Sequence, residues 1–168
     1  MKGNIYLSGF MGSGKSSVGL ALARRLGLGF LDLDRQVERR AGLSLPRLFE
    51  RGEEAFRRLE SSALRQASRL RGRVVALGGG ALLDPCNRRL VKGSGILVSL
   101  VCSERELWRR LKPELALRPL LQGPKPRSRL RALLRNRRRL YASADLRVST
   151  TGRSPEQAAV IIARRLGA

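Results

Sequence analysis

The chain has 168 residues and a formal net charge of +22 at pH 7, from 35 Lys and Arg residues against 13 Asp and Glu residues. This length is typical of one compact domain, and a hydrophobic content of 42% excludes wholesale disorder. The charge makes nucleic acid a partner to consider, whereas an aromatic content of 4% argues against a protein that stacks on single-stranded bases.

Other protein classes are excluded by local features. Apolar stretches such as Gly95–Cys102 fall far short of the ~18–20 residues that span a bilayer. The start of the chain lacks the apolar region of a secretory signal, and two cysteines, Cys86 and Cys102, are too few for a disulfide framework or a zinc site. The absence of histidine excludes histidine-based catalysis and metal ligation. We expect a reduced, cytoplasmic, soluble protein with buried thiols.

Short apolar runs alternate with helical patterns in the first half of the chain. Asn4–Ser8 is predicted to be a strand, Lys15–Leu26 a helix that Gly27 ends, and Phe30–Leu33 a second strand. Glu53–Leu70 is predicted to be a long amphipathic helix, because apolar residues recur there at steps of three and four. These residues are Phe56, Leu59, Ala63, Ala67 and Leu70.

The alternation continues in the second half. Val74–Leu77 and Ile96–Val101 are apolar runs of strand length, and Ser103 and Ser154 each begin a capping-box pattern that opens a helix. Continuous apolar strands between helices indicate a parallel sheet that is covered on both faces. The expected fold class is therefore α/β, a three-layer, doubly wound domain.

The segment Lys112–Arg127 breaks this rhythm. It contains four prolines and no pattern of a strand or a convincing helix. Irregular segments of this length are often functional lids, so we expect a lid here.

The strongest motif is Gly9–Ser16, a complete G-x-x-x-x-G-K-[ST] P-loop between a predicted strand and a predicted helix. Its glycines let backbone N–H groups surround phosphate oxygens, and the helix N-terminus adds the positive end of its dipole. Lys15 is expected to reach the β- and γ-phosphates, and the Ser16 hydroxyl to ligate Mg²⁺.

Asp32 and Asp34 lie at the carboxyl end of the second predicted strand. Ligands of open α/β sheets bind at that edge, and two alternating acids there suit a magnesium site and an acceptor for a hydroxyl. The alternative is that Asp34 is only the N-cap of the next helix.

Two further features require close reading. Arg57 and Arg58 lie within the segment Gly52–Glu60, and paired arginines are commonly solvated helix surface. Gly78–Gly80 follows a buried strand; three successive glycines are costly in entropy and indicate either close approach of a ligand to the main chain or a flexible turn.

Together these motifs resemble shikimate kinase. In chain order they are the P-loop, Asp32-x-Asp34, Gly-Glu-x-x-Phe-Arg-x-x-Glu at Gly52–Glu60, Gly78–Gly80, Arg118-Pro-Leu-Leu and Arg137-x-x-Leu-Tyr. They span nearly the whole chain, from Ile5 to Pro155. The P-loop alone indicates only a nucleotide-binding protein, and the other motifs make the resemblance specific.

The resemblance implies ATP-dependent phosphorylation of the shikimate 3-hydroxyl in aromatic amino-acid biosynthesis. The implied fold is a P-loop NTPase domain of the nucleoside-monophosphate-kinase type, with a five-stranded parallel sheet, as a single kinase domain over residues 1–168. Residues 34–61, approximately, would form the substrate-binding helical region, and residues 112–127 the mobile lid. ATP is then the co-substrate and Mg²⁺ the cofactor, and we expect a monomer with no specific nucleic-acid partner and no membrane association.

The resemblance also implies roles for individual residues. Lys15, Asp34 and Arg118 would be catalytic, with Arg118 as a lid arginine that swings toward the phosphates. The implied ATP-binding residues are Gly12, Ser13, Gly14, Lys15, Ser16, Ser17, Arg110, Arg118 and Pro155, of which Arg110 and Pro155 fall where the family contacts adenine. The implied shikimate-binding residues are Asp34, Arg57, Gly78, Gly79, Gly80 and Arg137, and Glu60 would orient Arg57. Ser16 would ligate Mg²⁺, and Asp32 would hold it through water.

Elementary chemistry supports several of these roles. A carboxylate in a partly closed site calls for the bidentate donors that arginine supplies. In a chain without histidine, Asp34 is the plausible proton acceptor, although a loose transition state leaves the need for a discrete base open.

Two alternatives are weighed against this hypothesis. A nucleoside monophosphate or gluconate-type kinase would share the fold, but the triple glycine and the Phe-Arg-x-x-Glu motif count against it. A nucleic-acid-binding P-loop protein would use the seven arginines of Arg127–Arg139 on phosphate backbones. The interpretation we favour for that run is a solvated helix face that carries one or two substrate-binding arginines.

Overall fold

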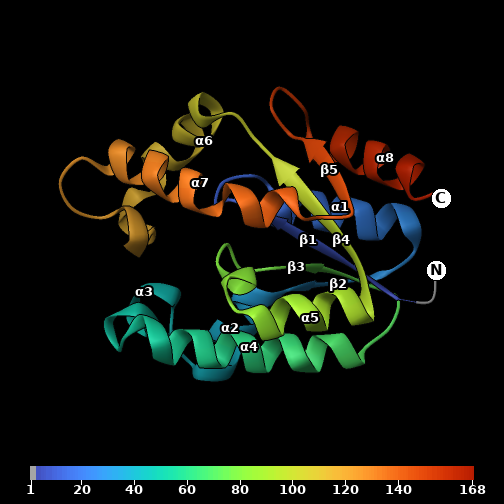
Figure 1. The fold of residues 1–168 in the computed structure, drawn as a ribbon, viewed down its shortest axis with the longest axis horizontal. Coiled ribbons are helices and arrows are strands. Elements are labelled where there is room, and N and C mark those ends of the chain that lie inside the picture. The colour runs from blue at the N-terminus through green and yellow to red at the C-terminus, as the bar shows by residue number, and fades with distance from the viewer. Residues whose placement is uncertain (1–2) are drawn as a thin grey trace.

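The computed structural model describes residues 3–168, and a single sheet of five parallel strands forms its centre (Figure 1). The strands are β1 (Asn4–Gly9), β2 (Gly29–Asp32), β3 (Arg73–Ala76), β4 (Gly95–Val101) and β5 (Leu146–Ser149). Their order in the sheet is β2-β3-β1-β4-β5, and every neighbouring pair is parallel. The expected doubly wound, five-stranded α/β fold is therefore confirmed.

Helices cover both faces of this sheet (Figure 1). The α-helices are α1 (Lys15–Leu26), α2 (Leu33–Ala41), α3 (Leu45–Glu50), α4 (Glu53–Arg69), α5 (Pro85–Ser94), α6 (Glu104–Leu111), α7 (Pro126–Ala142) and α8 (Pro155–Arg165). Three 3₁₀ helices join them, η1 (Ala81–Leu83), η2 (Lys112–Leu117) and η3 (Pro119–Leu121). Helices α1 and α8 pack together on one face, and α4 packs with α5 on the other.

Alternation along the central strand divides the core between the two faces. Ile5 and Leu7 of β1 lie in the cluster with α1 and α8, whereas Tyr6 lies in the cluster with α4 and α5. All three are fully buried, as a strand covered on both sides requires. Burial of each such side chain contributes about 1.5–3 kcal/mol to folding.

A third apolar cluster lies at the carboxyl ends of the strands. It joins Phe10 of the P-loop to Leu107 and Leu111 of α6, Leu121 of η3 and Leu130 of α7. The predicted lid segment is therefore anchored to the P-loop by buried side chains at its base.

The start of α2 differs from expectation. Strand β2 ends at Asp32, and Leu33 already begins α2, because the Asp32 carboxylate accepts a hydrogen bond from the Arg35 N–H as the N-cap. Asp34, considered above as the cap, lies in the first turn of the helix.

The predicted apolar face of α4 is confirmed at Phe56, Ala63 and Ala67 but is wrong at its two leucines. Leu59 and Leu70 are exposed, at 38% and 43%, and Glu60 and Leu64 are buried instead. A pattern of apolar residues does not include Glu60, whose buried carboxylate accepts a hydrogen bond from Arg57.

The two predicted capping boxes and the predicted burial of both cysteines are each only partly confirmed. The Ser154 capping box is present with both bonds, but at Ser103 only half forms, because Glu106 pairs with Arg109 and Arg110 instead of the Ser103 backbone. Cys86 is exposed in the first turn of α5 and Cys102 is partly buried, so the expectation of buried thiols is wrong for Cys86.

The lid segment contains no strand and, before Pro126, no α-helix, as expected, but it is not irregular. It folds as the two 3₁₀ helices η2 and η3, and Pro126 and Arg127 form the first turn of α7.

Over residues 3–168 no helix combines the length and the hydropathy that a membrane span requires.

Candidate active site

The candidate site lies at the carboxyl ends of β1, β2 and β3. From β1 the chain passes to β2 and β3 on one side of that strand, and then to β4 and β5 on the other side. The topological switch point therefore lies between β1 and β3. The P-loop follows β1, Asp32 ends β2, and Gly78–Gly80 follows β3. The sheet order therefore brings together three motifs that are far apart in the sequence.

The P-loop lysine is folded back over its own loop. Lys15 Nζ donates hydrogen bonds to the carbonyl oxygens of Gly9 at 3.0 Å and Phe10 at 3.1 Å. Desolvation by the surrounding protein lowers the pKa of Lys15 to about 8, although Asp34 and Asp32 act in the opposite direction. An anion above the loop would offset this desolvation and restore the ordinary pKa.

Ser16 and Asp32 form a pair beside Lys15. The Ser16 hydroxyl donates to Asp32 Oδ2 at 2.5 Å, and both residues line a cavity with Lys15 and Asp34. Within residues 3–168 no group of three or more Asp, Glu, Cys or His side chains is placed to hold a metal ion. A hydroxyl and a carboxylate alone are a hard oxygen donor set of the kind that fits Mg²⁺, whose other ligands are then phosphate oxygens and water.

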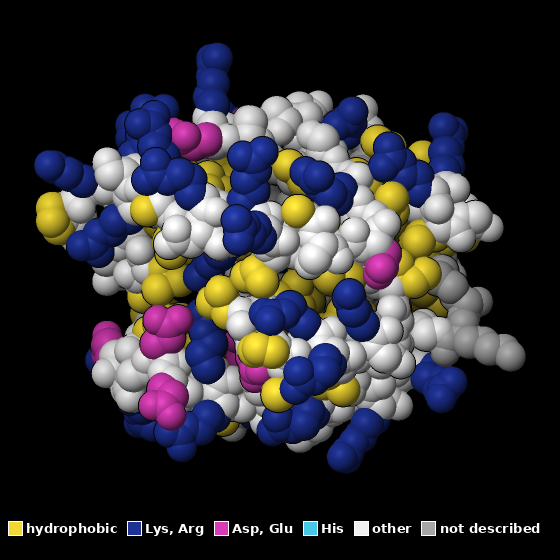
Figure 2. All heavy atoms as spheres, viewed as in Figure 1, with side chains coloured by type: hydrophobic (Ala, Val, Ile, Leu, Met, Phe, Trp, Pro, Cys, Tyr) yellow, Lys and Arg dark blue, Asp and Glu magenta, His cyan; other side chains and the backbone are white. Residues whose placement is uncertain are grey.

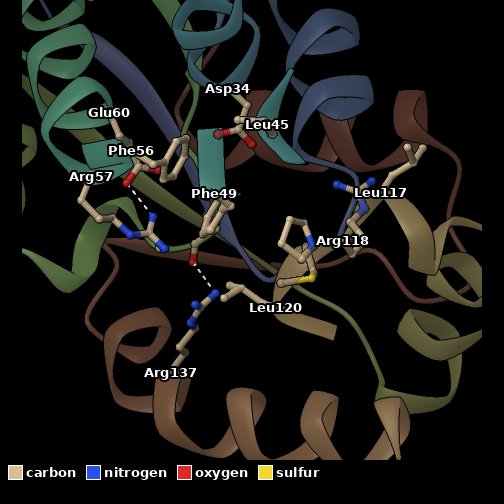
Figure 3. Close-up of a pocket in the computed structure, with 14 residues that line it drawn as sticks. Asp34, Leu45, Phe49, Phe56, Arg57, Glu60, Leu117, Arg118, Leu120 and Arg137 are labelled. Carbon is tan, nitrogen blue, oxygen red and sulfur yellow. Dashed lines mark hydrogen bonds and ion pairs between the residues drawn. The ribbon is translucent and has the colours of Figure 1, made fainter. Parts of the chain in front are cut away.

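A second cavity lies between α3, α4, the lid segment and α7 (Figure 3). Its apolar wall consists of Met11, Leu45, Phe49, Phe56, Leu117, Pro119 and Leu120. Its polar lining consists of Asp34, Arg57, Glu60, Arg118 and Arg137, with the backbone of Gly79 and Gly80. An apolar wall with a few convergent polar groups is typical of a small-molecule site.

Arg57 is held in this cavity from three sides. Its Nη1 donates to Glu60 Oε2 at 2.7 Å and its Nη2 to Glu53 Oε1 at 2.9 Å, while the guanidinium lies 5.1 Å from the centre of the Phe56 ring. Arg58, one residue later, has a side chain that is 75% exposed and pairs with Glu54. Only one of the two adjacent arginines therefore points inward.

Arg137 reaches the cavity from the opposite side (Figure 3). It is 4% exposed, and its Nη1 donates to the Gly79 carbonyl oxygen at 3.1 Å. The Tyr141 hydroxyl donates to the same oxygen at 2.9 Å. The other arginines of the run 127–139 are exposed, which agrees with a solvated face that carries one inward residue.

Gly78 and Gly80 leave no room for a side chain, because other side chains of the protein approach their Cα atoms closely. A Cβ at Gly78 would lie 2.0 Å from Glu60 Oε1 and 2.8 Å from Asp34 Oδ1, and a Cβ at Gly80 would lie 2.5 Å from Arg57 Nη2. Gly78 is buried against these carboxylates, whereas Gly79 and Gly80 line the cavity. Desolvation raises the pKa of Asp34, although Lys15 opposes this shift, so its carboxylate is a stronger proton acceptor than an exposed one.

A third cavity adjoins the P-loop on the side of α8. Gly12, Ser13, Gly14, Ser17, Arg110 and Pro155 line it, together with Thr150 and Arg153, which no motif in the sequence singled out. Arg110 is directed inward by donating to Glu106 and to the carbonyl oxygens of Gly12 and Thr150, while the side chain of Arg109 is 72% exposed. Thr150 is placed there by β5, whose position in the sheet the local sequence does not reveal.

Arg118 lies where the three cavities meet, since it lines each of them. Its Nη2 pairs with Glu114 Oε2 at 2.6 Å. The predicted site residues thus come together around Arg118, apart from Gly78, which is buried and lines none of the three cavities.

Comparisons with known proteins find similar chains over nearly the whole length of this one. The shikimate kinase family model matches residues 11–166. A shikimate kinase of Geobacter sulfurreducens is 47% identical over 161 residues, which cover 95% of this chain and 88% of that protein. The solved shikimate kinase of Acinetobacter baumannii in complex with shikimate has a TM-score of 0.93 at 38% identity, covering 98% of this chain and 93% of its own.

A gluconokinase from Sinorhizobium meliloti is also similar, with a TM-score of 0.60 at 22% identity over 98% of this chain and 93% of its own. This similarity is one of fold alone.

Proposed function

The chain belongs to the shikimate kinase family, and on that premise we propose how its site transfers the γ-phosphoryl group of ATP to the 3-hydroxyl of shikimate. The protein is an ATP-dependent kinase of shikimate. The observation that carries the proposal is the convergence of Lys15, Asp34 and Arg118 between a cavity beside the P-loop and a cavity with two inward arginines.

ATP is proposed to bind across the P-loop. The N–H groups at the start of α1 and the Lys15 ammonium would bind the phosphates. Gly12, Ser13, Gly14 and Ser17 would contribute the loop itself. The cavity formed by Arg110, Thr150, Arg153 and Pro155 would hold the adenine end of the nucleotide.

Mg²⁺ is proposed to be held by the Ser16 hydroxyl directly and by Asp32 through water, because these two oxygens already face each other beside the loop. When bound, the ion supplies positive charge to the β- and γ-phosphate oxygens. Ser16 and Asp32 would fix its place, and Lys15, which lines the same cavity, would contact the phosphates.

Shikimate is proposed to bind in the cavity of Figure 3. Arg57 and Arg137 present fork-shaped donors to a carboxylate, and both are held in place by protein acceptors before the ligand arrives. Phe49, Phe56 and Leu120 would cover the apolar face of the ring, with Gly79 and Gly80 at its edge.

The transfer step is proposed to take place at Asp34. Asp34 accepts a hydrogen bond from the attacking hydroxyl and then its proton, for which its raised pKa is suited. Lys15 and Arg118 stabilise the negative charge that spreads over the transferring phosphoryl group. Closure of the segment 112–127 over the site would exclude water, which otherwise competes as an acceptor.

The cavity wall argues against a gluconate-type acceptor. Gluconate carries a hydroxyl on nearly every carbon, and an aromatic and aliphatic wall would leave several of these without hydrogen-bond partners. Shikimate carries three hydroxyls against five in gluconate, so fewer of them would face this wall.

A coupled assay of ADP release tests the proposal. With ATP and Mg²⁺ present, shikimate should give turnover well above the ATPase background, while gluconate and nucleoside monophosphates should not. Turnover with gluconate or a nucleotide but not with shikimate would show that the acceptor has been misassigned.

A further inference from the structure

The lid arginine has a partner of its own within the lid. Arg118 Nη2 and Glu114 Oε2 are 2.6 Å apart, and the two side chains are 33% and 49% exposed. Arg118 Nε is buried and has no hydrogen-bond partner among residues 3–168. The guanidinium is therefore only partly satisfied: Glu114 is the carboxylate paired with it, and Asp34 lies near enough to interact with its charge.

Glu114 itself faces the nucleotide cavity. It lines that cavity together with Gly12, Gly14 and Arg118. A polyphosphate placed there would compete with this carboxylate for the same guanidinium.

The backbone fixes the position of this pair. Glu114 lies at a kink in η2, with φ −111° and ψ 17°, and the N–H of Arg118 donates to the Leu115 carbonyl oxygen at 3.0 Å. Leu121, three residues beyond Arg118, is fully buried in the cluster that contains Phe10. The backbone of η2 thus sets the spacing of the pair, and the buried Leu121 anchors the segment beyond it, although η2 itself buries none of its residues.

We propose that Glu114 is a positioning residue that acts through Arg118. It holds the guanidinium at the junction of the cavities in the nucleotide-free enzyme and yields it to the phosphates when nucleotide binds. This inference rests on the proposed function only in that Arg118 reaches the phosphates. Glu114 then lowers nucleotide affinity and thereby favours release of ADP after transfer.

The expected effect follows from the kind of pair. Half-exposed ion pairs at this spacing are weak, so its loss should strengthen ADP binding by about two- to fivefold. An effect of this size is resolved by titration calorimetry.

The test compares Glu114→Gln with a matched control. Glu54→Gln removes a pair of the same spacing, Glu54 with Arg58, on the exposed side of α4. Glu114→Gln should lower the dissociation constant for ADP, and Glu114→Asp and Glu54→Gln should leave it nearly unchanged. Unchanged or weaker ADP binding in Glu114→Gln overturns the proposal.

A double-mutant cycle separates action through Arg118 from direct repulsion. In an Arg118→Met background, Glu114→Gln should no longer strengthen ADP binding. The same fold-change in both backgrounds would mean that Glu114 acts on the phosphates directly, which also overturns the proposal. Because ADP titration needs no acceptor, failure here is distinct from failure of the shikimate assay.

Discussion

Arg57 and Arg58 are neighbours on α4, yet their surroundings differ in kind. Arg57 is held by Glu53 and by the buried Glu60, and it lines the proposed shikimate cavity, whereas Arg58 extends into solvent. A charged hydrogen-bond donor that faces a ligand carboxylate is worth more than an exposed one.

Substitution of each arginine by alanine should separate these roles. Arg57→Ala should weaken shikimate binding by about tenfold or more and leave ADP binding nearly unchanged, since charged hydrogen bonds are worth ~1.5–3 kcal/mol. Arg58→Ala is the matched control and should change neither affinity. Calorimetric titration with each ligand is the measurement. Loss of both affinities together in Arg57→Ala would mean that the residue is structural.

Lys15 should give nucleotide binding a defined pH dependence. Desolvation lowers its pKa to about 8 in the free protein, and bound phosphates favour the ammonium and raise the pKa again. Below pH 8 the lysine is charged in both states and affinity is flat. Above pH 8 the free lysine is neutral and must take up a proton when ADP binds. The ADP dissociation constant should therefore rise by about tenfold per pH unit.

Titration of ADP between about pH 7 and pH 9.5 measures this slope, which linkage assigns to a single proton. Lys15→Met should bind ADP weakly and lose the slope. A slope that persists in Lys15→Met would assign the titration to another group.

At the scale of elements, the turn from β3 to η1 shows what the sequence can and cannot predict. Three glycines after an apolar run predicted either a close approach of a ligand to the main chain or a flexible turn, and the structure shows close approaches of protein side chains. The approaching atoms at Gly78 and Gly80, however, belong to Glu60, Asp34 and Arg57. Which partner lies against a glycine depends on helix packing, which no local pattern encodes.

Alanine substitutions in this turn should therefore rank by the surroundings of each glycine. Gly78→Ala and Gly80→Ala place a Cβ 2.0 Å and 2.5 Å from held side chains, and such overpacking costs about 1–3 kcal/mol of folding free energy. Gly79→Ala, with its nearest contact at 3.6 Å, should leave stability unchanged. Denaturant unfolding of the three variants is the measurement, and equal midpoints would contradict this ranking.

Other elements also divide into those that the sequence predicts and those that depend on the packing of distant segments. The P-loop and the helix after it could be predicted because a complete motif, flanking apolar residues and a terminating glycine agree with one another. Helices η2 and η3 could not, because they have no periodicity, and Thr150 could not, because the sheet order brings β5 to the P-loop. The sequence could not decide between Asp32 and Asp34 as the cap, because the apolar run Phe30–Leu33 extends one residue beyond β2.

At the scale of the whole molecule, the net charge of +22 is not concentrated at one place. Figure 2 shows Lys and Arg side chains spread over the visible face, above α4 and α5 as well as α7. A positive field spread over the surface does not form one basic patch for a nucleic acid to bind. It attracts small anions from all directions. Both substrates of the reaction are anions, so this field should act on how fast they arrive.

The rate constant for ADP association should therefore fall with salt. Between about 0.05 M and 0.5 M NaCl we expect a decrease of about tenfold, because screening removes long-range attraction and leaves contacts in the site largely intact. Stopped-flow mixing with a fluorescent ADP analogue separates association from dissociation. Replacing the exposed Arg135, Arg138 and Arg139 by glutamine, outside the site, should slow association at low salt and leave dissociation unchanged. An association rate that is insensitive to salt would mean that the surplus arginines do not steer ligands.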